Sequence, residues 1–208
     1  MKIIINTKNI QQGLNAVKNI TGKNLNLPIL NAILMTNKNN QLIFSATNLE
    51  LGINYYLNTQ IKEEVKIAIP SKVFADFISG IKDEKIELEA RDNILNIQSA
   101  NFKTKLICLN NKDFPLIPKL KKEPLAELPS KVLKNALSSV FDSISLSQTR
   151  PELGGMFIEL NRSKICFAST DSFRLAEKII NADCKKNISV IIPRNTVAEL
   201  IRILSDYE

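Results

Sequence analysis

The stretch that decides the fold occurs twice in the chain. Residues 33–53 read ILMTNKNNQLIFSATNLELGI, and residues 156–176 read MFIELNRSKICFASTDSFRLA. Thr47 of the first stretch corresponds to Thr170 of the second, an offset of 170 − 47 = 123 positions. A similarity of this length at a fixed offset indicates an internal repeat.

Two flanking segments keep the same offset without gaps. Residues 7–17 correspond to 130–140, and residues 69–81 correspond to 192–204. Three matches at one offset are hard to produce by chance, so we expect two copies of one folding unit. The copies meet near PKLKKEP at 118–124, where proline and lysine are typical of a linker.

Helical and strand periodicities alternate within each copy. Ile10, Leu14 and Val17 recur on one helix face, with Thr7 as the expected N-cap. The second helix follows a Pro-Ser start and places on its apolar face Val73, Phe74, Phe77, Ile78 and Ile81. The patterns predict helices at 7–20, 71–81, 130–141 and 194–204, and strands at 41–47, 51–57, 65–70, 85–90 and 94–100. The expected fold class is α+β, with each helix packed on the sheet of its own unit.

The two copies differ in length. We expect a first domain over residues 1–120 and a second over 125–208. The strand-rich block 86–118 of the first copy has no counterpart before residue 208. The second domain is therefore expected to be incomplete and the chain to be a fragment, with unpaired strand edges that favour aggregation.

Composition narrows the function classes. Of 208 residues, 44% are hydrophobic and 24% charged, and 28 Lys and Arg against 21 Asp and Glu give a net charge of +7. This predicts a folded chain and favours a polyanion as its partner. No apolar run is long enough for a membrane span or a secretory signal, and three cysteines without a CxxC motif fit a reducing compartment. We expect a cytoplasmic protein without membrane contact.

Signals for catalysis are weak. The chain has no histidine, which excludes Ser-His-Asp and Cys-His nucleophiles and every His-containing metal site. Gly22-Lys23 lacks the upstream glycine of a phosphate-binding loop. Four carboxylates fall at predicted turns or strand starts, as is typical of a solvated surface: Glu63, Glu64, Asp83 and Glu84. We expect no enzymatic activity, no metal and no cofactor.

The polar faces of the four predicted helices carry mainly basic side chains. These are Lys8, Lys18, Lys72, Lys131, Lys134, Arg194 and Arg202. For any one helix, an ordinary solvated face explains them. The same bias on four equivalent helices favours a surface for phosphates, with sequence-independent and salt-dependent contacts. Aromatic residues do not interleave with the basic ones, which argues against stacking of single-stranded nucleic acid.

Six motifs, in this order, resemble the bacterial β sliding clamp family, the processivity subunits of DNA polymerase III. They are NLPILNAIL at 26–34, SATNLELGI at 45–53, IPSKVFADFI at 69–78, NKDFP at 111–115, TDSFRLAEK at 170–178 and IPRNTVAELIRIL at 192–204. The resemblance implies the DNA-clamp fold: three units per chain and two chains in a head-to-tail ring, with helices lining the hole and antiparallel sheets outside. It also implies that the third domain is absent here, and we expect it to pair with the strand around Lys103–Cys108.

The resemblance assigns DNA contacts to Lys23, Lys72, Gln148, Arg150, Arg194 and Arg202. Lys72, Arg194 and Arg202 match basic positions on the helices that line the hole, and the other assigned residues lie in loops. The family usually has a basic residue four positions before the proline of LPIL. This chain has Asn24 there, and the neighbouring Lys23 is the expected substitute.

The resemblance also assigns a peptide pocket to Leu153, Thr170, Ser172, Phe173, Arg174 and Leu175. From residue type alone, the two leucines read as core residues and Thr170-Asp171 reads as a turn whose side chains bond the local backbone. In the family, Leu153 and Leu175 would instead line an apolar cavity, with the stem of Arg174 along the rim. The third domain would supply the remaining wall, and partners would insert an extended segment resembling Q-x-x-L-x-F.

The implied partners are double-stranded DNA without sequence preference, the DNA polymerase III alpha subunit, a clamp loader ATPase complex, other proteins with a clamp-binding motif, and a second copy of the full-length protein. A basic adaptor that binds peptides and never encircles DNA is the alternative. Retention on nicked circular DNA, with loss from linear DNA, separates the two.

Overall fold

The computed structural model of the chain describes residues 2–21, 27–59, 63–118, 123–147 and 149–205. The chain divides into two units, Met1–Pro118 and Lys119–Glu208. Elements of the second unit repeat those of the first at the offset found in the sequence. Strands β2 and β9 begin at Ala32 and Gly155, and 155 − 32 = 123. The predicted repeat is therefore a repeat of structure.

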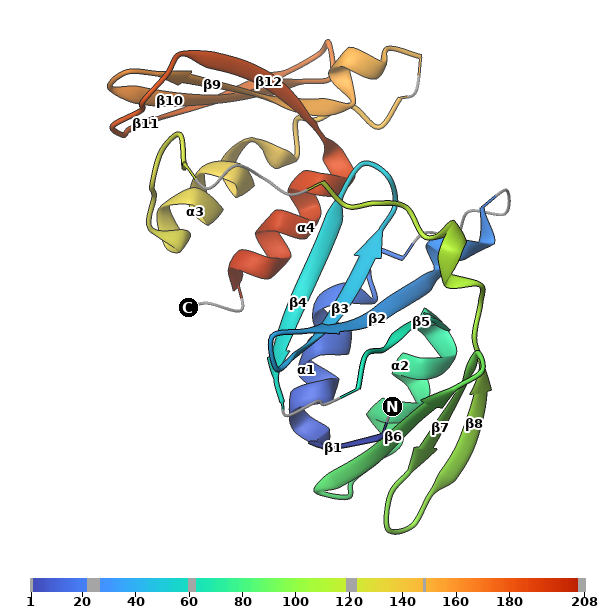
Figure 1. Cartoon of the computed structure of the whole chain (residues 1–208). Helices are drawn as coiled ribbons and strands as arrows, with labels where there is room; N and C mark the ends of the chain where they lie inside the picture. The colour runs from blue at the N-terminus through green and yellow to red at the C-terminus, as the bar shows by residue number, and fades with distance from the viewer. Residues whose placement is uncertain (1, 22–26, 60–62, 119–122, 148, 206–208) are drawn as a thin grey trace. The chain divides into compact units, whose positions relative to one another are not determined.

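The first unit contains two four-stranded antiparallel sheets (Figure 1). One sheet has the order β1-β6-β7-β8 and is formed by β1 (Lys2–Asn6), β6 (Lys85–Arg91), β7 (Ile94–Gln98) and β8 (Lys103–Ile107). The other has the order β4-β3-β2-β5 and is formed by β2 (Ala32–Lys38), β3 (Gln41–Thr47), β4 (Gly52–Asn58) and β5 (Lys66–Pro70). An isolated bridge pairs Ala68 of β5 with Leu109, which follows the end of β8.

Two-residue turns set the register of two hairpins. Asn39 and Asn40 have φ of 50° and 59°, and Asp92 and Asn93 have φ of 48° and 60°. Asn and Asp tolerate this left-handed region, and turns of this kind match the twist of the flanking strands. Consequently β2 pairs with β3 from Lys38 and Gln41 outward.

Helix α1 (Thr7–Val17) begins directly after β1. The Asn6 side chain accepts a hydrogen bond from the Lys8 backbone N–H at 2.9 Å, so Asn6 is the N-cap and the prediction of Thr7 is wrong by one residue. Thr7 is the first helical residue, and its hydroxyl donates to the Asp83 carbonyl at 2.5 Å. A Cβ added at Gly13 would lie 3.0 Å from the Phe44 ring, so this glycine allows α1 to pack closely on β3.

Helix α2 (Ser71–Gly80) supplies Phe74 and Ile78 to the core. Val73 is 54% exposed, so its predicted place on the apolar face is wrong, since it lies one position too early for the buried stripe. The Gln11 side chain of α1 donates to the carbonyls of Ile78 at 3.0 Å and Ile81 at 3.2 Å. The Ile78 carbonyl also accepts the Ile81 N–H at 3.2 Å, so the Gln11 bonds add a link between α1 and the C-terminal end of α2.

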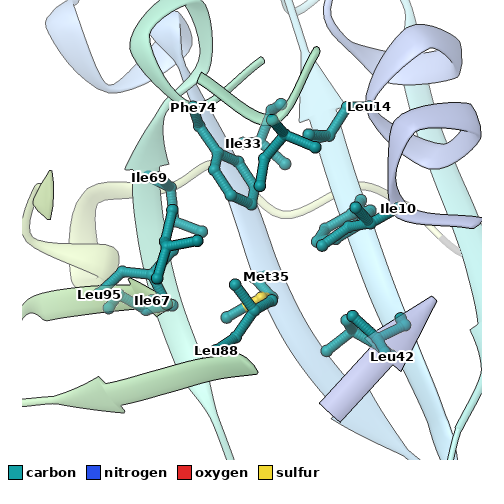
Figure 2. Close-up of a cluster of buried hydrophobic side chains, with 14 of the residues drawn as sticks. Ile10, Leu14, Ile33, Met35, Leu42, Ile67, Ile69, Phe74, Leu88 and Leu95 are labelled. Carbon is teal, nitrogen blue, oxygen red and sulfur yellow. The ribbon is translucent and has the colours of Figure 1, made fainter. Parts of the chain in front are cut away.

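One hydrophobic core serves both helices and both sheets of the first unit (Figure 2). Ile10 and Leu14 of α1 face Phe74 of α2, Met35 of β2 and Leu88 of β6 within this cluster. The rings of Phe44 and Phe74 meet edge to face, with centroids 6.2 Å apart. Because the apolar faces of α1 and α2 are both buried in this core, the basic faces of the two helices remain outside it.

The second unit has one antiparallel sheet with two helices on one of its faces (Figure 1). The sheet order is β11-β10-β9-β12, formed by β9 (Gly155–Asn161), β10 (Lys164–Thr170), β11 (Leu175–Asn181) and β12 (Ile188–Pro193). Helix α3 (Ser130–Phe141) contacts β10 and β11, and α4 (Arg194–Ser205) contacts β9 and β12. Buried Leu137, Val140, Met156 and Phe167 form the centre of this core.

Candidate functional site

The basic side chains predicted on the helix faces have different surroundings. Lys72 on α2 is exposed, as are Lys8, Lys18 and Lys131. Lys134 on α3 is half-buried. Exposed ammonium groups keep their charge available to a polyanion at modest cost, because little desolvation is needed to reach them.

Of the three loop residues assigned to DNA, one lies among the described residues. Arg150 is exposed, and its carbonyl accepts the Leu153 backbone N–H at 3.0 Å, at the start of the short helix η3 (Pro151–Leu153). Lys23 and Gln148 lie outside the described residues, as does Asn24. Their predicted contacts stay predictions.

Arg194, at the first position of α4, is engaged inside the second unit. Its Nη1 donates to the carbonyls of Phe141 and Ile144, each at 3.1 Å. Its guanidinium carbon lies 4.2 Å from the centroid of the Phe141 ring, a cation–π arrangement. No local pattern predicts these contacts, since the partners lie 53 and 50 positions away in the sequence.

Arg202 pairs with Glu199 on the same helix. Its Nε lies 2.8 Å and its Nη2 lies 2.5 Å from Glu199 Oε1. The Arg202 side chain is 31% exposed. This i, i+3 pair neutralises part of the positive charge that the sequence suggested for this face of α4.

The turn between β10 and β11 is ordered by its own side chains. The Thr170 hydroxyl donates to the Arg174 carbonyl at 2.7 Å and accepts the Ser172 N–H at 3.1 Å. Asp171 Oδ1 accepts the N–H groups of Phe173 and Arg174, each at 3.0 Å. Ser172 has a positive φ of 78°. The predicted self-bonding Thr-Asp turn is confirmed.

Hydrogen bonds shift the acidity of Asp171. The backbone N–H of Phe173 is the largest cause that lowers the pKa of this carboxyl below its ordinary value of 3.8, followed by the N–H of Arg174 and then by the Arg174 guanidinium. Arg174 Nε lies 3.0 Å from Asp171 Oδ2. The carboxylate is thus ionised at neutral pH and holds the turn in one conformation.

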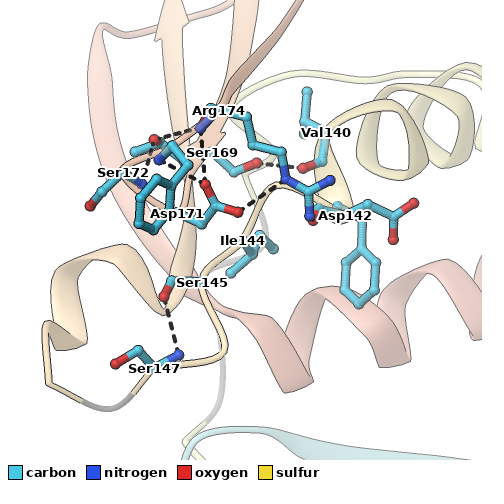
Figure 3. A network of polar contacts seen from close by, with 12 residues as sticks. Val140, Asp142, Ile144, Ser145, Ser147, Ser169, Asp171, Ser172 and Arg174 are labelled. Carbon is cyan, nitrogen blue, oxygen red and sulfur yellow. Dashed lines mark hydrogen bonds and ion pairs between the residues drawn. The ribbon is translucent and has the colours of Figure 1, made fainter.

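The end of α3 accepts side-chain hydrogen bonds from β10, from the β10–β11 turn and from α4. Figure 3 shows Ser169 and Arg174 beside this helix end. Arg174 Nη2 donates to the Asp142 carbonyl at 2.6 Å, and the Ser169 hydroxyl donates to the Val140 carbonyl. The Arg194 guanidinium donates to the carbonyls of Phe141 and Ile144. The terminal carbonyls of a helix have no partners within it and carry partial negative charge, so two guanidinium groups are favourable there.

Apolar side chains project from the β10–β11 turn and the start of β11. Phe173 is 98% exposed and Leu175 is 73% exposed. Leu153 is half-buried, and its carbonyl accepts the Ser145 N–H at 3.1 Å. Leu146, for which the sequence carries no signal of a site, is also exposed. The reading of Leu175 as a core residue is excluded, and apolar surface of this kind is available for a partner.

Signals for other chemistry are absent from the part of the chain that the structure describes. No group of three or more Cys, Asp or Glu side chains there is arranged to hold a metal ion. None of its helices combines the length and the apolar character needed to cross a membrane.

Comparison with known families identifies both units. Residues 1–118 match the family described as DNA polymerase III beta subunit, N-terminal domain. Residues 127–208 match DNA polymerase III beta subunit, central domain. The two matches follow one another in the order of their names and together include most of the chain.

Curated relatives carry the same name. The beta sliding clamp of Halalkalibacterium halodurans is 25% identical over 221 aligned positions, which include 100% of this chain and 58% of that protein. The beta sliding clamp of Staphylococcus aureus (strain Mu50) is 29% identical over 192 positions, with 88% of this chain and 51% of that protein. The chain thus spans about half the length of the curated relatives it matches.

Solved structures share the fold. The DNA polymerase sliding clamp of Bacillus subtilis superposes with a TM-score of 0.93 at 22% identity and covers 99% of this chain and 57% of its own. The sliding clamp of Bartonella birtlesii, solved bound to griselimycin, gives a TM-score of 0.89 at 26% identity with the same coverage of 99% and 57%. With both family matches in tandem and this fold, the chain belongs to the DNA polymerase III beta subunit family, the beta sliding clamps.

Proposed function

We propose that this chain forms the first two domains, about 1–120 and 125–208, of a DNA sliding clamp that encircles duplex DNA and tethers the replicative polymerase. The tandem match of the N-terminal and central family domains is the observation that carries the proposal. The relatives are nearly twice as long as this chain, which supports a third unit in the complete protein. A second copy of that protein would then close the ring. The protein acts in the cytoplasm and contacts no membrane.

The clamp has no catalytic step and works by topology. A ring around the duplex converts a fast-dissociating contact into a sliding one, and a polymerase bound to the ring stays at high effective concentration near the primer end. Tight phosphate contacts would stop the sliding. Exposed lysines such as Lys72 and Lys131 suit the task, because their contacts with phosphate are weak, independent of sequence and screened by salt.

Lys23, Gln148, Arg150 and Arg202 complete the proposed DNA-binding set. Arg194 is left out of it, because its guanidinium is engaged with the Phe141 and Ile144 carbonyls. Arg150 is exposed and free to approach a phosphate without unfolding any element. Arg202 would have to exchange part of its contact with Glu199 for a phosphate contact. We therefore expect the lysines to contribute more to the salt dependence of binding than Arg202 does.

The peptide pocket is proposed on the second unit, around the β10–β11 turn. Phe173 and Leu175 present apolar surface there, while Thr170 and Asp171 hold the turn in shape. Leu153, Ser172 and Arg174 complete this side of the pocket, and the third unit supplies the other wall. The Bartonella birtlesii relative binds griselimycin, which supports a ligand-binding surface in the family. The proposed occupants are the DNA polymerase III alpha subunit, the clamp loader and other proteins with a clamp-binding motif.

A loading experiment tests the ring. The complete gene product is loaded onto nicked circular plasmid with a clamp loader and ATP, and the plasmid is then linearised. A sliding ring stays on the circle and is lost from the ends of the linear molecule. The alternative, a peptide-binding adaptor, predicts equal and salt-sensitive binding to both forms, and that result would overturn the proposal.

A further inference from the structure

The four carbonyls at the end of α3 hold together the two parts of the proposed pocket. One part is the β10–β11 turn with Leu175, which reaches α3 through the bond from Arg174 to the Asp142 carbonyl at 2.6 Å. The other is the segment that ends in Leu153, whose carbonyl accepts the Ser145 N–H at 3.1 Å. Both parts therefore take their position from the residues immediately after α3.

Arg194 joins these parts with three hydrogen bonds. Its Nη1 donates to Phe141 and Ile144, on either side of the carbonyl that Arg174 uses. Its backbone N–H donates to the Gly154 carbonyl at 3.0 Å, next to Leu153. One residue thus fixes the chain leaving α3 and the chain entering β9, and Figure 3 shows Arg174 bound to the same helix end.

The contacts of Arg194 require a guanidinium. The planar group stacks on the Phe141 ring at 4.2 Å while one of its nitrogens reaches two carbonyls. A lysine ammonium keeps the charge but has no flat face to stack and no fork of donors in fixed directions. Arg194→Lys therefore keeps the positive charge at this position and removes the planar, forked shape of the guanidinium.

We infer that Arg194 is a positioning residue for the peptide pocket, which sets the placement of Leu153 relative to the Arg174–Leu175 segment. This inference rests on the proposed function, since the pocket itself is a proposal. It differs from the DNA contact that the family resemblance assigns to Arg194, because an arginine that holds the helix end acts on peptide affinity rather than on phosphate binding. A partner peptide then meets walls that are already ordered and does not have to order them on binding.

Hydrogen exchange on this chain tests the positioning role without any ligand. In Arg194→Ala, backbone amides of residues 142–147 should exchange faster, because the bonds to the Phe141 and Ile144 carbonyls are lost. Residues 171–175 should also exchange faster, because the Asp142 carbonyl that Arg174 uses lies between those two and loses its fixed position. Arg194→Lys should give nearly the same increase. Arg162→Ala, which removes the same charge from the exposed β9–β10 turn, should change neither segment. Thermal unfolding followed by circular dichroism checks that each variant remains folded. Unchanged exchange in Arg194→Ala and Arg194→Lys would overturn the inference.

Peptide and DNA titrations on the complete gene product separate the inference from the proposed function. With a fluorescent Q-x-x-L-x-F peptide, Arg194→Ala and Arg194→Lys should both weaken binding about tenfold, because the peptide must then order the walls itself. The slope of log affinity for duplex DNA against log salt should stay unchanged in both. If Arg194→Lys binds peptide like the wild type while Arg194→Ala lowers the salt slope by about one unit, Arg194 is a phosphate contact and the inference fails. If the wild type itself binds no peptide, the proposed pocket fails, and the exchange experiment still decides whether Arg194 orders these segments.

Discussion

Truncation of Leu175 should reduce partner binding without affecting folding. Full burial of a leucine side chain contributes about 1.5–3 kcal/mol. Leu175 is 73% exposed in the chain, so nearly three-quarters of that contribution, about 1–2 kcal/mol, is still to be gained when a peptide covers it. Leu175→Ala should therefore weaken peptide binding roughly 5- to 30-fold. Because folding leaves this side chain largely in water, the free energy of unfolding should change by no more than about 0.5 kcal/mol.

Fluorescence anisotropy with a labelled Q-x-x-L-x-F peptide measures the affinity, and urea denaturation measures the stability. Leu116→Ala is the matched control, because Leu116 is a leucine of the first unit that is 95% exposed and lies outside the proposed pocket. It undergoes the same chemical change and should bind the peptide like the wild type. Wild-type affinity in Leu175→Ala would refute the reasoning, as would an equal loss in the control.

Four further changes test other parts of the structure. Phe74→Ala removes a fully buried ring of the first core and should cost about 3–5 kcal/mol of unfolding free energy in urea denaturation. Lys72→Ala with Lys131→Ala should lower the slope of log DNA affinity against log salt by about 1–2 units in the complete gene product; an unchanged slope removes both lysines from the DNA surface. The pKa of Asp171 is lowered from 3.8 in the folded chain, so the carboxylate should order the turn above pH 3.8 and lose this effect as the pH falls through the lowered pKa. The NMR shift of the Phe173 amide should report this loss, and Asp171→Asn should show no such step. Burial raises the pKa of the Cys108 thiol to about 11, so this cysteine should react with a disulfide reagent at pH 8 far more slowly than a free thiol, as followed by mass spectrometry.

Local signals predicted most of the fold. The apolar spacing of Ile10, Leu14 and Val17 predicted helix α1 and its buried face. The internal repeat predicted the equivalent helix α3 in the second unit. The predicted start of β3 at residue 41 and of β7 at residue 94 is confirmed, because Asn-Asn and Asp-Asn turns mark those positions in the sequence. Helix α1 ends at Val17, before the predicted end at residue 20.

Features that depend on distant partners were missed. Strand β1 is short and pairs with β6, more than seventy residues away, so its own five residues carry little signal. Asn6 caps α1 because the chain leaves β1 at that residue, and a pattern of apolar spacing does not contain this information. The same limit applies to Arg194, which looks like any other basic residue of an amphipathic helix until the end of α3 is placed beside it.

The candidate site was predictable only through family resemblance. Residue type suggested a buried Leu175. In the structure Leu175 is the first residue of β11, pairs with Thr170 and is mostly exposed. The turn chemistry of Thr170 and Asp171 was readable from the sequence, because both side chains bond to backbone groups two to four positions away.

The pairing of β1 with β6 also constrains the order of events during synthesis. Lys2 lies opposite Glu89 and Asn6 opposite Lys85, so the first strand made has no partner until residues 85–89 leave the ribosome. At about 5–20 residues per second, this delay lasts roughly 4–17 s. Throughout it, Ile3 and Ile5, which are buried in the finished unit, remain in water or on a chaperone. We expect codon choice between β1 and β6 to set the length of this exposure, and with it the yield of folded protein, without altering a single contact of the native state.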